Sequence, residues 1–199
     1  TLLVAGNFLD SQLIWKFHIF SAFCKAKGIK NIVVDNELSE ISKKYLIKNF
    51  NKDFKLHFLK RKNKFREIIR YSFKIIINFH EILSYSLINR EVLLKKKVWE
   101  RYQFEHAVWD SSILNSRDIV INPSTLTKLK NTLICYLAFL RAKELTKKYH
   151  IESAFLGHTV YSSRAYILGL RRSNKNIEVI ASACDCLYKL DKNKDRSSF

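Results

Sequence analysis

The sequence predicts an α/β protein with an open, mainly parallel sheet, helices on both faces and a helical insertion. Two observations carry this prediction. Short apolar runs alternate with amphipathic helical stretches, which is typical of parallel βαβ units. Gly and Pro are scarce, at 4 and 1 of 199 residues, whereas an all-β sandwich needs many turns. The 47% hydrophobic content is enough to form a core, so we expect one folded domain over residues 1–199.

The first βαβ unit begins with the apolar run 2–5, which Gly6 and Asn7 close as a turn. Gly28 stands where a helix C-terminus favours a left-handed residue, and the apolar run 32–35 predicts the next strand. The intervening helix has an apolar face with steps of four, three and four residues, made by Leu13, Phe17, Phe20 and Cys24.

The pattern then predicts a helix over 39–49 and a strand over 54–59, followed by the basic run 60–64. We expect the helical insertion to cover about residues 64–118. Its main element is one long helix over 65–88, with an apolar side formed by Phe65, Ile69, Phe73, Ile76, Ile77, His80, Leu83 and Leu87.

This long apolar helix is not a membrane span, because Arg70, Lys74 and Glu81 interrupt it. Two alternatives remain for it. Beside the basic run it can lie in a bilayer interface, or it can pack on the sheet or against a further domain.

The second half resumes the alternation, with a helix over 126–149, a strand over 153–157, a helix over 163–172 and a strand over 178–181. The first of these helices has a leucine face made by Leu126, Leu129, Leu133, Leu137 and Leu140. The complete pattern predicts a Rossmann-like sheet, in which the strands near Leu3, Val33, Phe155 and Val179 are neighbours.

Ligands of open α/β sheets bind beyond the carboxyl ends of the strands. Gly6 and Asn7 follow the first strand, and the sequence there lacks the G-x-G-x-x-G of a dinucleotide cradle. The segment after the strand at 153–157 brings an imidazole, hydroxyls and a guanidinium to a helix N-terminus, a natural site for an anion or a sugar. These side chains belong to His158, Thr159, Tyr161 and Arg164.

The segment 102–114 concentrates Glu105, His106 and Asp110 between large aromatic residues. This composition fits a carbohydrate-facing surface with a general base. The alternative is an exposed polar helix face with Trp109 in the core.

Two of these segments carry a family resemblance. Residues 109–114, Trp-Asp-Ser-Ser-Ile-Leu, resemble the "GDLIYDSYLR" signature of bacterial capsule and surface-polysaccharide biosynthesis proteins. Residues 157–170 are similar to their H-x-x-Y strand-to-helix element. The matching positions are Asp110, Ser111, His158 and Tyr161.

The sequence also departs from that signature. Glu105 and His106 stand where the signature has Gly-Asp, and Ser112 replaces its Tyr. No role of the Gly-Asp pair is therefore carried over to this chain.

The resemblance implies the acceptor-binding, N-terminal half of a two-domain GT-B glycosyltransferase. We expect a cytoplasmic location, which becomes peripheral on the inner face of the membrane if the long apolar helix docks to lipid. A glycan or lipid-linked acceptor binds this half, and a nucleotide-sugar donor binds a C-terminal domain, so we expect these 199 residues alone to be inactive. His158 and Asp110 are the candidate catalytic bases. The candidate substrate-binding residues are Gly6, Asn7, Ser111, Thr159, Tyr161 and Arg164.

We expect no cofactor and no metal. The cysteines are dispersed apart from the pair Cys184 and Cys186, and a C-x-C without a second ligand pair is weak evidence for zinc.

The formal net charge of +18 leaves a non-enzymatic alternative, a basic module that binds nucleic acid or an anionic membrane surface. Residues 60–64 and 95–97 supply the charge and nearby aromatics supply stacking surface. Nucleic acid is the less favoured partner, because no helix-turn-helix, zinc-finger or RNP-like signature is present. The charge is also what codon usage in an A/T-rich genome would produce on solvated faces.

Overall fold

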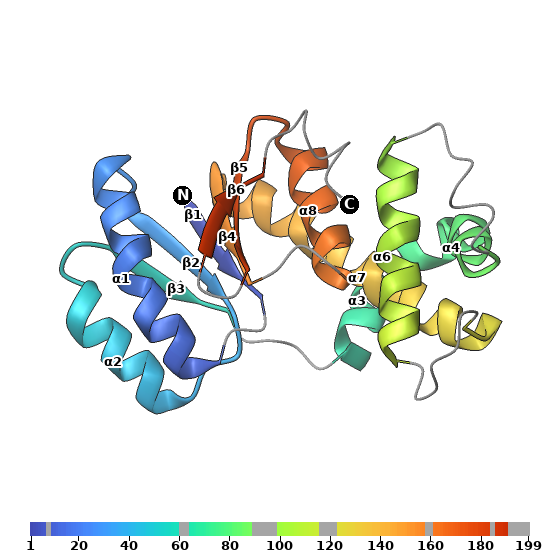
Figure 1. Ribbon diagram of the computed structural model, residues 1–199, viewed down its shortest axis with the longest axis horizontal. Coiled ribbons are helices and arrows are strands. Elements are labelled where there is room, and N and C mark those ends of the chain that lie inside the picture. The colour runs from blue at the N-terminus through green and yellow to red at the C-terminus, as the bar shows by residue number, and fades with distance from the viewer. Residues whose placement is uncertain are drawn as a thin grey trace. The chain divides into compact units, whose positions relative to one another are not determined.

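The computed structural model describes residues 1–6, 9–59, 64–88, 99–115, 123–157, 161–183 and 186–190 (Figure 1). The chain forms two compact units, each described by itself. The α/β unit comprises residues 1–61, 146–158 and 176–199, and the helical unit comprises residues 62–145 and 159–175.

The α/β unit contains one open sheet with the strand order β3-β2-β1-β4-β5-β6. Its strands are β1 (Leu2–Ala5), β2 (Asn31–Asp35), β3 (Lys55–Phe58), β4 (Ser153–Leu156), β5 (Glu178–Ala183) and β6 (Cys186–Lys189). The first five strands are parallel, and β6 runs antiparallel to β5. Leu3 pairs with Val33 and Ala154, and Ala154 pairs with Val179. The predicted open, mainly parallel Rossmann-like sheet and its neighbouring strands are confirmed.

Helices α1 (Asp10–Ala26) and α2 (Glu40–Phe50) pack together on one face of this sheet (Figure 1). The predicted apolar face of α1 is correct, because each of its four members is fully buried. Gly28 has φ +65° at the end of α1, as its position predicts. The opposite face of the sheet is buried as well, at Leu3, Val33, Ala154 and Val179.

The helical unit is built from α3 (Lys64–Ile77), α4 (Phe79–Ser86), α6 (Trp99–Asn115), α8 (Ser162–Ser173) and most of α7 (Thr125–Tyr149). It has a core of its own, in which α4, α6, α7 and α8 contribute aromatic and aliphatic side chains, among them Ile82, Tyr85, Phe104, Trp109, Leu137 and Ala165. The unit also includes residues beyond 118, so it is larger than the insertion expected over residues 64–118.

Two expectations about the elements need correction, and one strand was not predicted. The single helix over 65–88 is two helices, because α3 ends at Ile77 and α4 begins at Phe79. Between them, the side-chain amide of Asn78 donates to the Lys74 carbonyl at 2.8 Å, and such local bonds compete with a continuous helix. Leu126 is 77% exposed and does not belong to the buried face of α7. The edge strand β6 was not predicted.

Candidate functional site

The α/β unit has its topological switch point between β1 and β4, because the chain continues from β1 to one side of the sheet and later adds β4 on the other. Gly6 follows β1 with φ +138°, a conformation that favours glycine. Gly157 follows β4, and its N–H donates to the Ala5 carbonyl at 3.2 Å. Two glycines therefore lie at adjacent strand ends, where open α/β sheets bind ligands. Asn7, His158 and Thr159, which the sequence predicts at this edge, lie outside the described residues.

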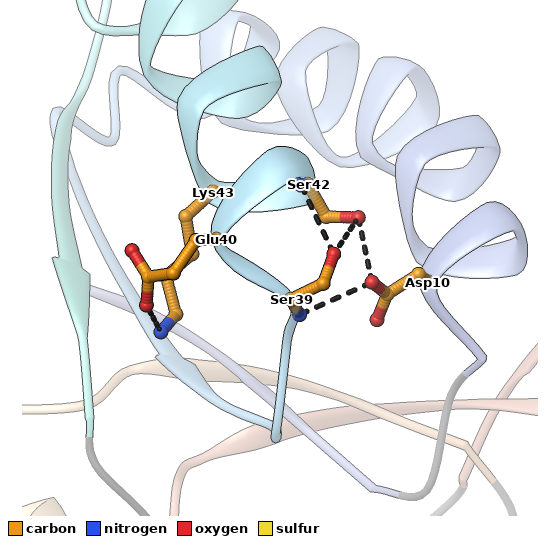
Figure 2. A network of polar contacts seen from close by, with 5 residues as sticks. All are labelled: Asp10, Ser39, Glu40, Ser42 and Lys43. Carbon is orange, nitrogen blue, oxygen red and sulfur yellow. Dashed lines mark hydrogen bonds and ion pairs between the residues drawn. The ribbon is translucent and has the colours of Figure 1, made fainter.

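A polar network fixes the helix N-termini that follow β1 and β2 (Figure 2). Oδ2 of Asp10, the first residue of α1, accepts the Ser39 N–H at 3.1 Å and the Ser42 hydroxyl at 2.7 Å. The Ser39 hydroxyl caps α2 by accepting the Ser42 N–H at 3.2 Å. The Ser39 and Ser42 hydrogen bonds lower the pKa of Asp10 below its ordinary value. The network ties the N-terminus of α1 to the N-terminus of α2.

The candidate catalytic geometry lies in the helical unit, where α6 packs against α8. Asp110 is on α6 and Arg164 is in the first turn of α8. Their Oδ2 and Nη1 atoms lie 3.7 Å apart, with the side chains 30% and 9% exposed respectively. Two of the predicted site residues are thus an ion pair whose carboxylate remains partly accessible.

His106 lies one helical turn before Asp110, on the same side of α6. Burial is the main reason that the pKa of the His106 imidazole is lowered, and the nearby Arg164 charge lowers it further. The charges of Asp110 and the completely buried Glu105 act in the opposite direction. Since the net shift is downward, His106 is neutral near pH 7 and can accept a proton.

The start of α8 has an unusual backbone. Tyr161 has φ 57° and ψ −143°, and its carbonyl accepts the Arg164 N–H at 3.1 Å. A non-glycine residue at positive φ is strained, and such strain is concentrated at functional sites. Tyr161 and Arg164, two of the predicted ligand-binding residues, therefore belong to one strained turn.

Ser111 is placed differently. Its side chain is buried, the hydroxyl donates to the Ala107 carbonyl at 2.6 Å, and it lies 3.8 Å from the Cys135 sulfur. These are contacts within the protein, and a substrate-binding role for Ser111 stays a prediction. Burial raises the pKa of the Cys135 thiol to about 12, so this cysteine is unreactive near neutral pH.

A cavity of about 510 Å³ opens within the helical unit. Aromatic rings of α6 and α7, among them Phe104, Tyr136 and Phe139, line it. Among the described residues, the cationic side chains of Lys74, Lys143 and Arg172 line it together with the carboxylate of Glu81. The Tyr85 hydroxyl donates to that carboxylate at 2.8 Å. The lining is suited to an anionic ligand with an apolar or ring-shaped body.

Sequence reasoning noted His106 but did not choose it as a site residue. The available signal was its four-residue spacing from Asp110, which places both side chains on one helix face. It missed the cationic lining of the cavity altogether, because Lys74, Lys143 and Arg172 come from three helices that only the fold brings together.

Searches against protein-family models, curated proteins and solved structures find no match to this chain. No group of three metal-ligating side chains occurs among the described residues. Within the same residues, no helix is both long and apolar enough to cross a membrane.

Proposed function

We propose that this chain is the acceptor-binding domain of a GT-B glycosyltransferase of bacterial surface or capsular polysaccharide biosynthesis. One observation carries the proposal. The two segments that resemble that family are far apart in the sequence, and they contribute Asp110 and Arg164 to a single ion pair. The Rossmann-type strand order supports the same class of protein.

In the proposed reaction, the acceptor hydroxyl attacks the anomeric carbon of a nucleotide-sugar held by a second domain. The bond from that carbon to the diphosphate breaks, and the hydroxyl proton passes to a base of this domain. Asp110 is the first candidate, because Arg164 fixes its carboxylate while leaving it partly accessible. His158 is the second candidate, and Thr159 and Tyr161 would bind the acceptor beside it.

The cavity of the helical unit supports acceptor binding as the role of this domain. Its cations fit a phosphate or carboxylate group, and its aromatic rings fit a sugar ring or an apolar chain. Lys143 and Arg172 line the cavity from α7 and α8, whereas Asp110 is not one of its lining residues. Binding and proton transfer should therefore be separable by mutation.

The test is transfer of labelled sugar from a panel of nucleotide-sugars to lipid-linked acceptors by the protein that carries this sequence. Asp110→Asn should lower kcat by about two to four orders of magnitude, whereas Lys143→Gln with Arg172→Gln should mainly raise the KM of the acceptor. Asp53→Asn, which also removes an ion-paired carboxylate, is the matched control and should change neither.

Calorimetry of the isolated 199 residues with UDP-, GDP- and CMP-sugars tests whether this domain binds the nucleotide-sugar donor. The expected result is no binding, because the sequence provides no phosphate cradle for a nucleotide. Micromolar binding would contradict the assignment to the acceptor side. Unchanged turnover in Asp110→Asn would exclude Asp110 as the base.

A further inference from the structure

Helix α3 is attached to the helical unit by its polar side. Glu67 of α3 forms an ion pair with Arg141 of α7, and Arg70 forms another with Glu144. The Tyr71 hydroxyl donates to the second carboxylate oxygen of Glu144 at 2.7 Å. Tyr71 and Ile75 also pack against the core of the unit, but the larger apolar side of α3 faces away from it, unlike that of the usual amphipathic helix.

The consequence is an exposed apolar row on α3, which we call the α3 row: Phe65, Ile69, Phe73 and Ile76. These side chains are 66%, 58%, 73% and 71% exposed. On α4 and its C-cap, Phe79, Leu83 and Leu87 form a second exposed row at four-residue spacing, at 53%, 40% and 64%. Contiguous exposed side chains of this size mark an interaction surface, whereas single exposed apolar residues need no explanation.

Positive charge accompanies the α3 row. Arg66 lies next to the row, and Arg70 and Lys74 follow it at four-residue intervals. Arg70 is paired with Glu144 and Lys74 lines the cavity, so Arg66 is the residue of this series that is left for an outside partner. The single acidic residue of α3, Glu67, is engaged by Arg141 on the polar side. In the sequence, Lys60, Arg61, Lys62 and Lys64 come directly before or at the start of the helix.

This charge distribution decides between occupants. A second copy of the chain would bring the positive charge beside its own α3 row against that of the first copy, and like charges repel. An anionic membrane is complementary, because it offers an apolar layer for the row and negative headgroups for the arginine and lysine side chains. A helix with one aromatic and aliphatic face and cations at its border is the usual interfacial type.

We propose that α3 docks this protein on an anionic lipid bilayer, with the α3 row inserted at the boundary between headgroups and acyl chains. Arg66 faces the lipid phosphates beside it. The polar side remains fixed to α7 through Glu67 and Arg70, so docking requires no refolding of the helix. The proposal does not depend on the glycosyltransferase assignment.

Co-sedimentation of the 199-residue protein with vesicles tests the proposal. Vesicles of phosphatidylcholine mixed with phosphatidylglycerol should bind the protein, vesicles of phosphatidylcholine alone should bind it much more weakly, and salt should release it. Phe73→Ser with Ile76→Ser should reduce the partition coefficient by about tenfold or more, because two large apolar side chains no longer enter the bilayer. Arg66→Gln should reduce it by about fivefold.

The matched control is Ile41→Ser with Leu126→Ser, which removes two side chains that are 82% and 77% exposed elsewhere. It should bind vesicles as the unmodified protein does. Circular dichroism should show equal melting temperatures for both double variants, since the altered side chains contact mainly solvent.

Three results would overturn the proposal. The first is absence of binding to the anionic vesicles, and the second is equal binding to both lipid compositions. The third is equal binding by the α3 variant and the control. Sedimentation equilibrium measures self-association of the same proteins. If the unmodified protein binds no vesicles but self-associates, and Phe73→Ser with Ile76→Ser abolishes that association, the α3 row binds a second copy of the chain.

Discussion

Arg164 Nη1 lies 3.7 Å from Asp110 Oδ2, and the guanidinium is the more deeply buried of the two groups. A buried cation needs a compensating charge, so Asp110 is held in place by the requirements of Arg164. The Asp110 side chain is nevertheless 30% exposed. The pair thus fixes one oxygen of Asp110 while a ligand can still reach the group. His106, one turn away, is influenced by both charges.

The first prediction concerns the titration of His106. Its pKa should lie below the value of about 6.5 for an unperturbed histidine, since burial and the Arg164 charge both oppose protonation. Arg164→Met should raise that pKa, and Asp110→Asn should lower it further. Two-dimensional NMR of the imidazole protons across the pH range measures the pKa of His106 in the unmodified protein and in both variants. Equal values in the two variants would contradict the electrostatic coupling.

His106 also makes stability depend on pH, with a definite sign. Because the folded-state pKa is depressed, the unfolded chain takes up a proton at a higher pH than the folded chain. The free energy of unfolding should therefore fall as the pH drops below about 6.5, until the folded state is protonated too. His106→Gln should lose less stability over this interval than the unmodified protein in urea titrations.

The sheet was predictable because its signals are local. Apolar runs such as 2–5 and 32–34 lie in strands buried on both sides, and such strands need no alternation of polar residues. Gly28 marked the end of α1 for a purely conformational reason. The edge strand β6 was missed, because Cys186–Lys189 is only four residues long and its sequence contains no run of aliphatic residues like those at 2–5 and 32–34.

The helical unit and the site were less predictable, since both depend on contacts between distant segments. Periodicity identified the apolar side of α3, but only the ion pairs with Arg141 and Glu144 decide that this side faces outward. Sequence reasoning chose Asp110 and Arg164 separately, the first as a candidate base and the second as a candidate substrate-binding residue. The prediction for His158 remains untested, because this residue lies outside the described part of the chain.

A second prediction tests the contact between α7 and α8. A Cβ at Gly169 would lie 2.3 Å from the Phe139 carbonyl oxygen and 2.9 Å from the Ala142 Cβ. Gly169→Ala should therefore destabilise the protein by about 1–3 kcal/mol, although alanine is the better helix former by about 1 kcal/mol. Chemical denaturation measures the change.

Gly28→Ala is the control for this prediction. No atom lies within 4 Å of a Cβ at Gly28, and the cost comes from φ +65° alone. We expect a loss of about 1 kcal/mol. If Gly169→Ala were stabilising, the close packing of α8 on Phe139 would be wrong.

A third prediction concerns Asp10 and the tie between α1 and α2. Asp10→Asn keeps an acceptor oxygen but removes the charge that Ser39 and Ser42 stabilise. At about pH 7 the variant should be less stable by about 1 kcal/mol, a value reduced for partial solvent exposure. Thermal or urea unfolding checks the difference.

The pH dependence of this difference follows from the lowered pKa of Asp10. A depressed carboxyl pKa stabilises the fold above the unfolded value of about 3.9, and the contribution is lost as the pH falls through the folded pKa. The gap between the two proteins should therefore close in acid. When both proteins also carry Ser42→Ala, the difference in stability caused by Asp10→Asn should be smaller at neutral pH, because one of the donors to Asp10 is then missing. A gap that persists in acid would mean that the charge is not its cause.

The last prediction concerns His158, which follows β4 in the sequence. As the second candidate base of the proposed transferase, its imidazole would take the proton of the acceptor hydroxyl. His158→Ala should then lower turnover by about two to four orders of magnitude, with little change in melting temperature. His150→Ala is a suitable control, because His150 is exposed at the end of α7. A His158→Ala protein that melts early but keeps its turnover per folded molecule would give His158 a structural role and leave Asp110 as the base. Loss of turnover in His158→Ala with full turnover in Asp110→Asn would reverse that assignment.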